Sequence, residues 1–167
     1  MKRWQLVAAA LLTVVEIAVA QSSFPMVKIK SVIQPDRGYV VQEIVVDGKK
    51  FEPNQLAEAG QAALLSSGWK MANAKKREKL ALDWCTQVVL AGRTPLVDAP
   101  PDFKQEKHPF QAPGAKTEAD GNIHVRIWLH DGGSMRGPAN RYYRSHWSFS
   151  PAGQIKSLKP VEEWTPS

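Results

Sequence analysis

Apolar and polar residues alternate in two segments near the end of the chain, residues 123–130 and 141–149. Successive side chains of a β-strand point to opposite faces, so this alternation predicts two half-buried strands. The glycine-rich residues 131–140 suit an antiparallel return between them, and the turn at 150–153 leads to a third strand over 154–159. The pattern predicts a three-stranded meander with one apolar face and one polar face.

Burial of one face also predicts the register of this meander. If the apolar sides of the first two strands share one core, Val125 lies opposite Trp147 and Arg126 lies opposite His146. A shift of one residue would place Val125 opposite His146, so burial makes the register specific.

The first half of the chain predicts two strands followed by two helices. Residues 27–33 alternate, residues 39–46 are rich in β-branched side chains, and Asp47-Gly48 marks a hairpin turn. The expected helices span residues 54–66 and residues 73 to just before Gly92. Their expected buried residues are Leu56, Ala59, Ala63 and Leu64 in the first helix, and Leu80, Ala81, Trp84, Cys85, Val88 and Ala91 in the second. We expect Trp84 from this helix and Trp147 from the sheet to be core residues.

Residues 94–113 break the regular patterns. They contain five prolines, Pro95, Pro100, Pro101, Pro109 and Pro113, which exclude a helix or a central strand. We interpret this segment as a long crossover with a short edge strand around residues 103–110. Disorder is the alternative.

These elements predict an α+β fold in which a curved antiparallel sheet packs on one or two helices. Their order, and the Phe149-Ser-Pro-Ala-Gly-Gln-Ile155 turn after an aromatic strand, resemble the cystatin-like and nuclear-transport-factor-like rolls, where a curved sheet wraps a helix. The resemblance is one of architecture. It implies no catalytic residue, because these folds host enzymes, binders and assembly proteins alike.

The amino-terminal residues have the layout of an export signal. A basic start containing Lys2 and Arg3 precedes the apolar residues 6–15, and Ala18 and Ala20 occupy the two positions that a signal peptidase reads. We expect residues 1–20 to be cleaved off, with an uncleaved membrane anchor as the alternative, and a periplasmic or secreted location in both cases. Residues 21–167 are long enough for a single α+β domain with a core of its own.

Positive charge is concentrated in the sheet. The whole chain has a net charge of +6, and residues 121–160 contain six Arg or Lys and one acid, Asp131. This asymmetry indicates a partner with negative charge, and the alternative is a soluble exported protein with a modest positive charge. The single cysteine, Cys85, excludes an internal disulfide. It lies in an apolar helical run and is expected to be buried and inert.

The polar face of the meander is the candidate binding surface. Arginine guanidinium groups suit carboxylate or phosphate, and aromatic rings offer stacking partners. The alternative is that another element or a sister subunit covers this face, with its aromatic residues engaged in packing. The candidate residues are His124, Arg126, Trp128, Tyr142, Arg144 and His146.

The histidines do not predict a metal site. His124 and His130 lie about 20 Å apart along a strand, which is too far to bind one ion. His124 with His146, or His108 with His130, could form a pair, but no cysteine or carboxylate spacing completes a site. No catalytic motif is present, and we predict no cofactor.

The sequence therefore predicts an exported, non-enzymatic binding or assembly module of the cell envelope, with a protein partner, self-association or an anionic ligand. Nucleic acid is not favoured, because no nucleic-acid module motif is present, and membrane contact is expected only with an uncleaved leader. The alternative is a small enzyme of the same fold, with a pocket between sheet and helix and His130 or His146 as base.

Overall fold

The computed structural model describes seven stretches of the chain. They are residues 14–18, 23–34, 38–90, 95–99, 110–131, 141–158 and 163–164.

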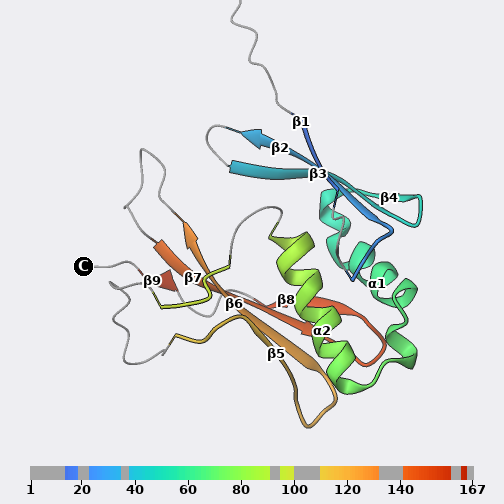
Figure 1. Ribbon diagram of the computed structural model, residues 1–167, viewed down its shortest axis with the longest axis vertical. Coiled ribbons are helices and arrows are strands. Elements are labelled where there is room, and N and C mark those ends of the chain that lie inside the picture. The colour runs from blue at the N-terminus through green and yellow to red at the C-terminus, as the bar shows by residue number, and fades with distance from the viewer. Residues whose placement is uncertain are drawn as a thin grey trace, which may run out of the picture.

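The first four strands form one antiparallel sheet in the order β1-β2-β3-β4 (Figure 1). The strands are β1 (Val14–Ala18), β2 (Val27–Gln34), β3 (Gly38–Val46) and β4 (Lys49–Phe51). Asp47 and Gly48 turn the chain between β3 and β4 with positive φ angles of 49° and 79°. Two successive positive φ angles are what the favoured two-residue hairpin turn requires, so the expected hairpin is confirmed.

The last five strands form a second antiparallel sheet in the order β5-β6-β7-β8, with β9 also paired to β7. They are β5 (Gly114–Thr117), β6 (Ile123–Asp131), β7 (Arg141–Phe149), β8 (Ile155–Leu158) and β9 (Glu163–Trp164). The meander expected from the alternating pattern is confirmed. So is its register, because Val125 lies opposite Trp147 and Arg126 lies opposite His146.

The two expected helices connect these sheets. A short 3-10 turn, η1 (Pro53–Gln55), leads into α1 (Leu56–Ser66), and η2 (Trp69–Met71) separates it from α2 (Ala74–Trp84). Asn73 caps α2, since its side chain accepts a hydrogen bond of 2.9 Å from the backbone N–H of Lys76.

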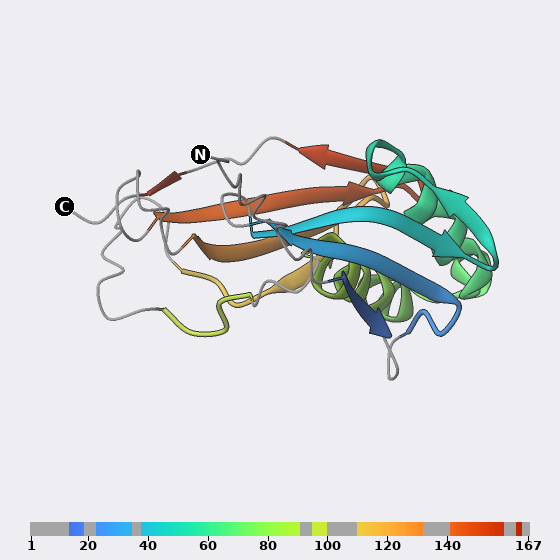
Figure 2. The same cartoon turned by 90° about the horizontal axis from the view of Figure 1, so that it is seen from above.

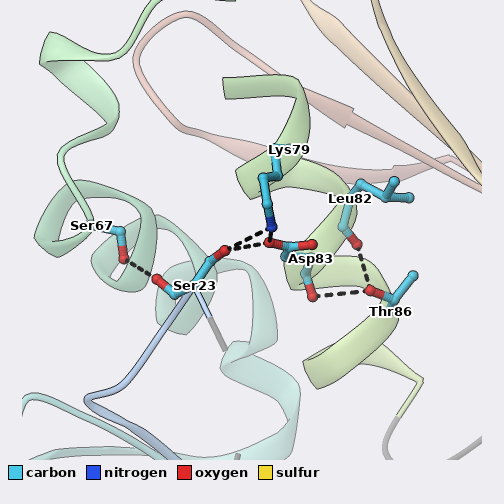
Figure 3. Close-up of polar contacts among 6 residues, drawn as sticks. All are labelled: Ser23, Ser67, Lys79, Leu82, Asp83 and Thr86. Carbon is cyan, nitrogen blue, oxygen red and sulfur yellow. Dashed lines mark hydrogen bonds and ion pairs between the residues drawn. The ribbon is translucent and has the colours of Figure 1, made fainter. Parts of the chain in front are cut away.

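The helix then continues as a π-helical turn, η3 (Cys85–Val89), which the sequence analysis did not anticipate. The hydroxyl of Thr86 donates back to the Leu82 carbonyl at 2.9 Å, as Figure 3 shows. A threonine that bonds to the preceding turn in this way commonly bends a helix.

One hydrophobic core is shared by both helices and both sheets. The helices lie against one end of the two sheets, and α1 contacts β3 and β4 of the first sheet as well as β8 of the second (Figures 1 and 2). Trp84 is fully buried, as expected, whereas Trp147 packs against the core and is only partly buried. The indole N–H of Trp69 donates to the Pro151 carbonyl at 3.0 Å, which ties the helical layer to the turn between β7 and β8.

The α+β class is confirmed, but the strands fall into two sheets where one curved sheet was expected. Within the described residues, no strand pairing joins β1–β4 to β5–β9. The two helices separate these groups along the chain and contact strands of both. Each group therefore forms a separate antiparallel sheet with edge strands of its own.

Two expectations fall partly on residues outside the described ranges. The first is the short edge strand expected around residues 103–110, of which residues 103–109 are not described. The edge strand next to β6 in the described part is β5. The export signal is the other: β1 lies within residues 1–20 and pairs with β2, and the remaining residues of that segment are not described. Of the helices in the described part, none combines the length and hydropathy needed to cross a membrane.

Candidate functional site

The predicted binding residues lie on one face of the second sheet, which we call the outer face. Ile123, Val125, Ile127 and Leu129 of β6 are buried in the shared core, so the alternate positions of β6 and its neighbours point to the other side. The outer face comprises Gly114, Lys116, His124, Arg126, Trp128, His130, Tyr142, Arg144, His146, Ser148, Lys156 and Leu158.

A histidine pair lies near the centre of this face. Nδ1 of His124 is 2.9 Å from Nε2 of His146, and the two ring centroids are 5.0 Å apart. At that distance one ring nitrogen donates its hydrogen and the other accepts it, so the two nitrogens cannot both carry a proton. His124 and His146 occupy diagonal positions on the adjacent strands β6 and β7, which brings their rings together. These are two histidines that the sequence suggested could form a pair.

Burial and positive charge keep His146 neutral. Burial, followed by the nearby charges of Arg126, His124 and Arg144, lowers the pKa of His146 from 6.5 to about 4. At neutral pH the imidazole of His146 is therefore an uncharged hydrogen-bonding group beside the charged guanidinium groups of Arg126 and Arg144.

The low pKa of His146 predicts that the fold loses stability as pH falls from about 6.5 toward about 4. In this window the unfolded chain binds a proton at His146 that the folded protein excludes, so protonation favours unfolding. Urea denaturation at a series of pH values measures the effect. The variant His146→Gln lacks this titration and should lose less stability over the same window, and equal losses in the two proteins would contradict the prediction.

Trp128 is buried although it occupies an outer-face position. Its side chain is 1% exposed and lies outside the core shared with the helices. The guanidinium carbon of Arg144 is 5.9 Å from the centre of the Trp128 ring, a cation–π contact. Beside them, the backbone N–H of Leu96 donates to the Trp128 carbonyl at 2.9 Å. The burial of Trp128 favours a packing role for its ring over an open stacking platform.

The other candidate residues differ in what the structure describes. His124, Arg126, Arg144 and His146 are half-buried on the outer face. Tyr142 lies opposite His130 on the adjacent strand, and for both residues only the backbone is described. The binding role of these residues stays a prediction.

Lys116 and Lys156 are outer-face cations that the sequence analysis missed. Both are exposed, and they lie at the two ends of a row that crosses the sheet through His124 and Ser148. Lys156 directly follows the core residue Ile155 in β8, so alternation along this strand was the signal that places Lys156 on the outer face. Lys116 had no such signal, because β5 follows the proline-rich segment.

The outer face is uniformly basic in the part of the sheet that the structure describes. Its positions on β5, β6, β7 and β8 include Lys116, Arg126, Arg144 and Lys156, and no Asp or Glu. Just beyond the end of β5, a carboxylate oxygen of Glu118 lies 3.9 Å from Lys116 Nζ. A sheet face whose charged strand positions are all cationic attracts an anion.

A groove of about 610 Å³ lies elsewhere, between the first sheet and the helices. It is lined by Ser23, Phe24, Pro25, Met26, Val27, Val46, Asp47, Ala63, Ser66, Ser67, Lys76 and Leu80. This groove contains no histidine, so it lacks the base that the enzyme alternative requires.

Other reactive side chains in the described part of the chain do not form a site. No group of three or more His, Cys, Asp or Glu residues there could hold a metal ion. Cys85 is fully buried, and burial raises the pKa of its thiol well above the usual value, so it is protonated at neutral pH.

No family model matches the chain, and no curated protein and no solved structure is significantly similar to it. The geometry and charge of the outer face are therefore the basis on which a role can be inferred.

Proposed function

We propose that the protein is an exported binding or assembly module of the cell envelope, which contacts an anionic partner or a sister subunit through the outer face of its second sheet. Residues 1–20 act as the export signal, so the folded part works in the periplasm or outside the cell. The two sheets are the halves of one roll around α1 and α2. This arrangement is supported by the core that both sheets share with the helices.

The observation that carries this proposal is the charge pattern of the outer face. Four cationic side chains occupy its described positions on β5–β8, and none of those positions holds an acid. Holding like charges on one sheet face is unfavourable unless solvent or an opposite charge relieves it. Planar guanidinium groups bind carboxylate, sulfate or phosphate groups through paired hydrogen bonds, and the His124–His146 pair adds further hydrogen-bonding groups beside them.

Arg126 is the residue on which binding should depend most. It lies between Gly114 of β5 and His146 of β7, in the row next to the one that joins Lys116 and Lys156. Arg126 is therefore central among the cationic side chains of this face. Its half-buried position also limits the solvent that screens it.

Retention on a heparin column tests the proposal with a polyanion of known chemistry. We expect Arg126→Gln to elute at clearly lower salt than the wild-type protein, because a central contact to sulfate is lost. Lys75→Gln is the matched control, since it removes one positive charge from an exposed position on α2, away from the outer face. Equal elution of the two variants would show that retention reflects net charge, and would contradict binding at the outer face.

A further inference from the structure

We propose that strand β2 is a second docking site, which pairs with an extended acidic segment of a partner protein once residues 1–20 have been removed. This inference rests on the proposed export and cleavage. It concerns the first sheet and is independent of the outer face of the second.

Strand β1 shows that this edge accepts an added strand. All five residues of β1 pair with β2 in antiparallel register, from Val14 opposite Val32 to Ala18 opposite Lys28. β1 is the outermost strand of its sheet, so cleavage after Ala20 leaves β2 at the edge. The backbone N–H and C=O groups of β2 that point away from β3 would then be unpaired, which is the requirement for strand addition.

The position of β2 does not depend on β1, because the chain just before β2 is fixed to both helices. The hydroxyl of Ser67 donates to the Ser23 carbonyl at 3.2 Å, and the hydroxyl of Ser23 donates to Asp83 of α2, as Figure 3 shows. Phe24 is 2% exposed, and its ring meets that of Trp84 edge to face at 5.6 Å. These contacts all follow Ala20, so they remain after cleavage.

The core side of β2 is held in the same way. Val27 and Ile29 are buried, and β3 pairs with β2 along its full length. Removal of residues 1–20 therefore uncovers an ordered edge rather than a loose segment.

The charges on the first sheet specify an acidic partner. Across the sheet, Lys30 lies opposite Glu43 of β3, and Glu43 in turn forms an ion pair of 2.9 Å with Lys50 of β4. On the other side of β2, Glu16 of β1 lies opposite Lys30. Charge thus alternates from strand to strand, and loss of β1 leaves an exposed lysine as the last member of the row.

A second copy of this chain is a poor occupant of the same edge. Lys28 and Lys30 are both exposed, and antiparallel pairing of β2 with another β2 can bring them opposite each other. Like charges directly opposite on paired strands are destabilising. The edge therefore favours a segment in which acidic residues alternate with apolar ones.

Peptide titration of the secreted protein tests this inference. Its amino terminus is first sequenced, and the ¹⁵N-labelled protein is then titrated with a capped peptide of alternating valine and glutamate. We expect amide shifts confined to residues 27–34. The charge-reversed double variant Lys28→Glu/Lys30→Glu should bind this peptide about tenfold more weakly and should instead bind a peptide of alternating valine and lysine.

Two controls separate strand pairing from simple attraction. A valine–glutamate peptide that is N-methylated at every residue keeps its charge but has no backbone N–H to donate to β2, and it should not bind. The uncleaved chain, whose edge is covered by β1, should not bind the unmodified peptide.

Each contrary outcome has a distinct meaning. Equal binding of the N-methylated peptide would overturn strand addition. A mature amino terminus at Gln21 without any peptide binding would overturn the inference and leave the export proposal intact. Retention of Met1 in the protein from its host would overturn this inference and the cleavage on which it rests, because the edge would never be uncovered.

Discussion

Replacement of Trp84 by alanine should lower the free energy of unfolding by about 3–5 kcal/mol, the usual cost of deleting a buried tryptophan. Trp84 is fully buried at the end of α2, where its ring meets Phe24 edge to face. The helices and both sheets share the core around it, so the surrounding structure cannot collapse easily into the space. Urea denaturation followed by circular dichroism measures the loss.

Two further variants make this prediction specific. Trp147→Ala should cost less than Trp84→Ala, because Trp147 is only partly buried. Trp84→Phe should also cost less, because it keeps a ring and removes an indole N–H that has no hydrogen-bond partner among the described residues. If Trp147→Ala proved the more damaging of the two alanine variants, the assignment of the core to the helix–sheet contact would be wrong.

Gly60→Ala should also destabilise the fold, by about 1–3 kcal/mol for an overpacked core position. A Cβ atom added at Gly60 would lie 2.3 Å from Cδ1 of Ile155 and 2.7 Å from Cε2 of Trp84. The end of the isoleucine side chain can shift, but the indole ring is fixed in the core. The clash should outweigh the gain of roughly 1 kcal/mol that alanine brings over glycine inside a helix.

Gln61→Ala is the matched control on the same helix, because it changes helix propensity at a half-buried position without entering this contact. Chemical denaturation of both variants gives the comparison. A Gly60→Ala protein as stable as the wild type would show that α1 and α2 do not approach as closely as described.

The local elements of this fold could be predicted because their signals lie within a few residues of one another. Alternation specifies which residues of β6 and β7 face the core, and burial of that face then specifies the register. Asp47-Gly48 and Asn73 act through the backbone of their immediate neighbours, so the hairpin and the start of α2 are also readable from sequence.

Features that depend on distant partners were not predictable in the same way. The division into two sheets depends on which strand edges meet, and no local pattern specifies that choice. Trp128 alternates with the core residues as an outer-face residue should, yet it is buried. The burial of Gly60 likewise follows from the approach of Trp84 and Ile155, which are far from it along the chain.

The candidate site shows the same limit. The parity of the strands placed His124, Arg126, Arg144 and His146 on one face, and the structure brings the two histidines into contact. Lys116 lies on this face because it belongs to β5, which pairs with β6. This strand was not predicted, because it directly follows the proline-rich segment.

A ¹⁵N-labelled NMR titration of the secreted protein with a heparin tetrasaccharide tests the central proposal most directly, because a sugar cannot add as a strand to β2. We expect amide shifts that are largest at Lys116, His124, Arg126, His146 and Lys156, and that diminish as salt is raised. Shifts spread over the exposed lysines of α2, or none on β6 and β7, would contradict a binding role for the outer face.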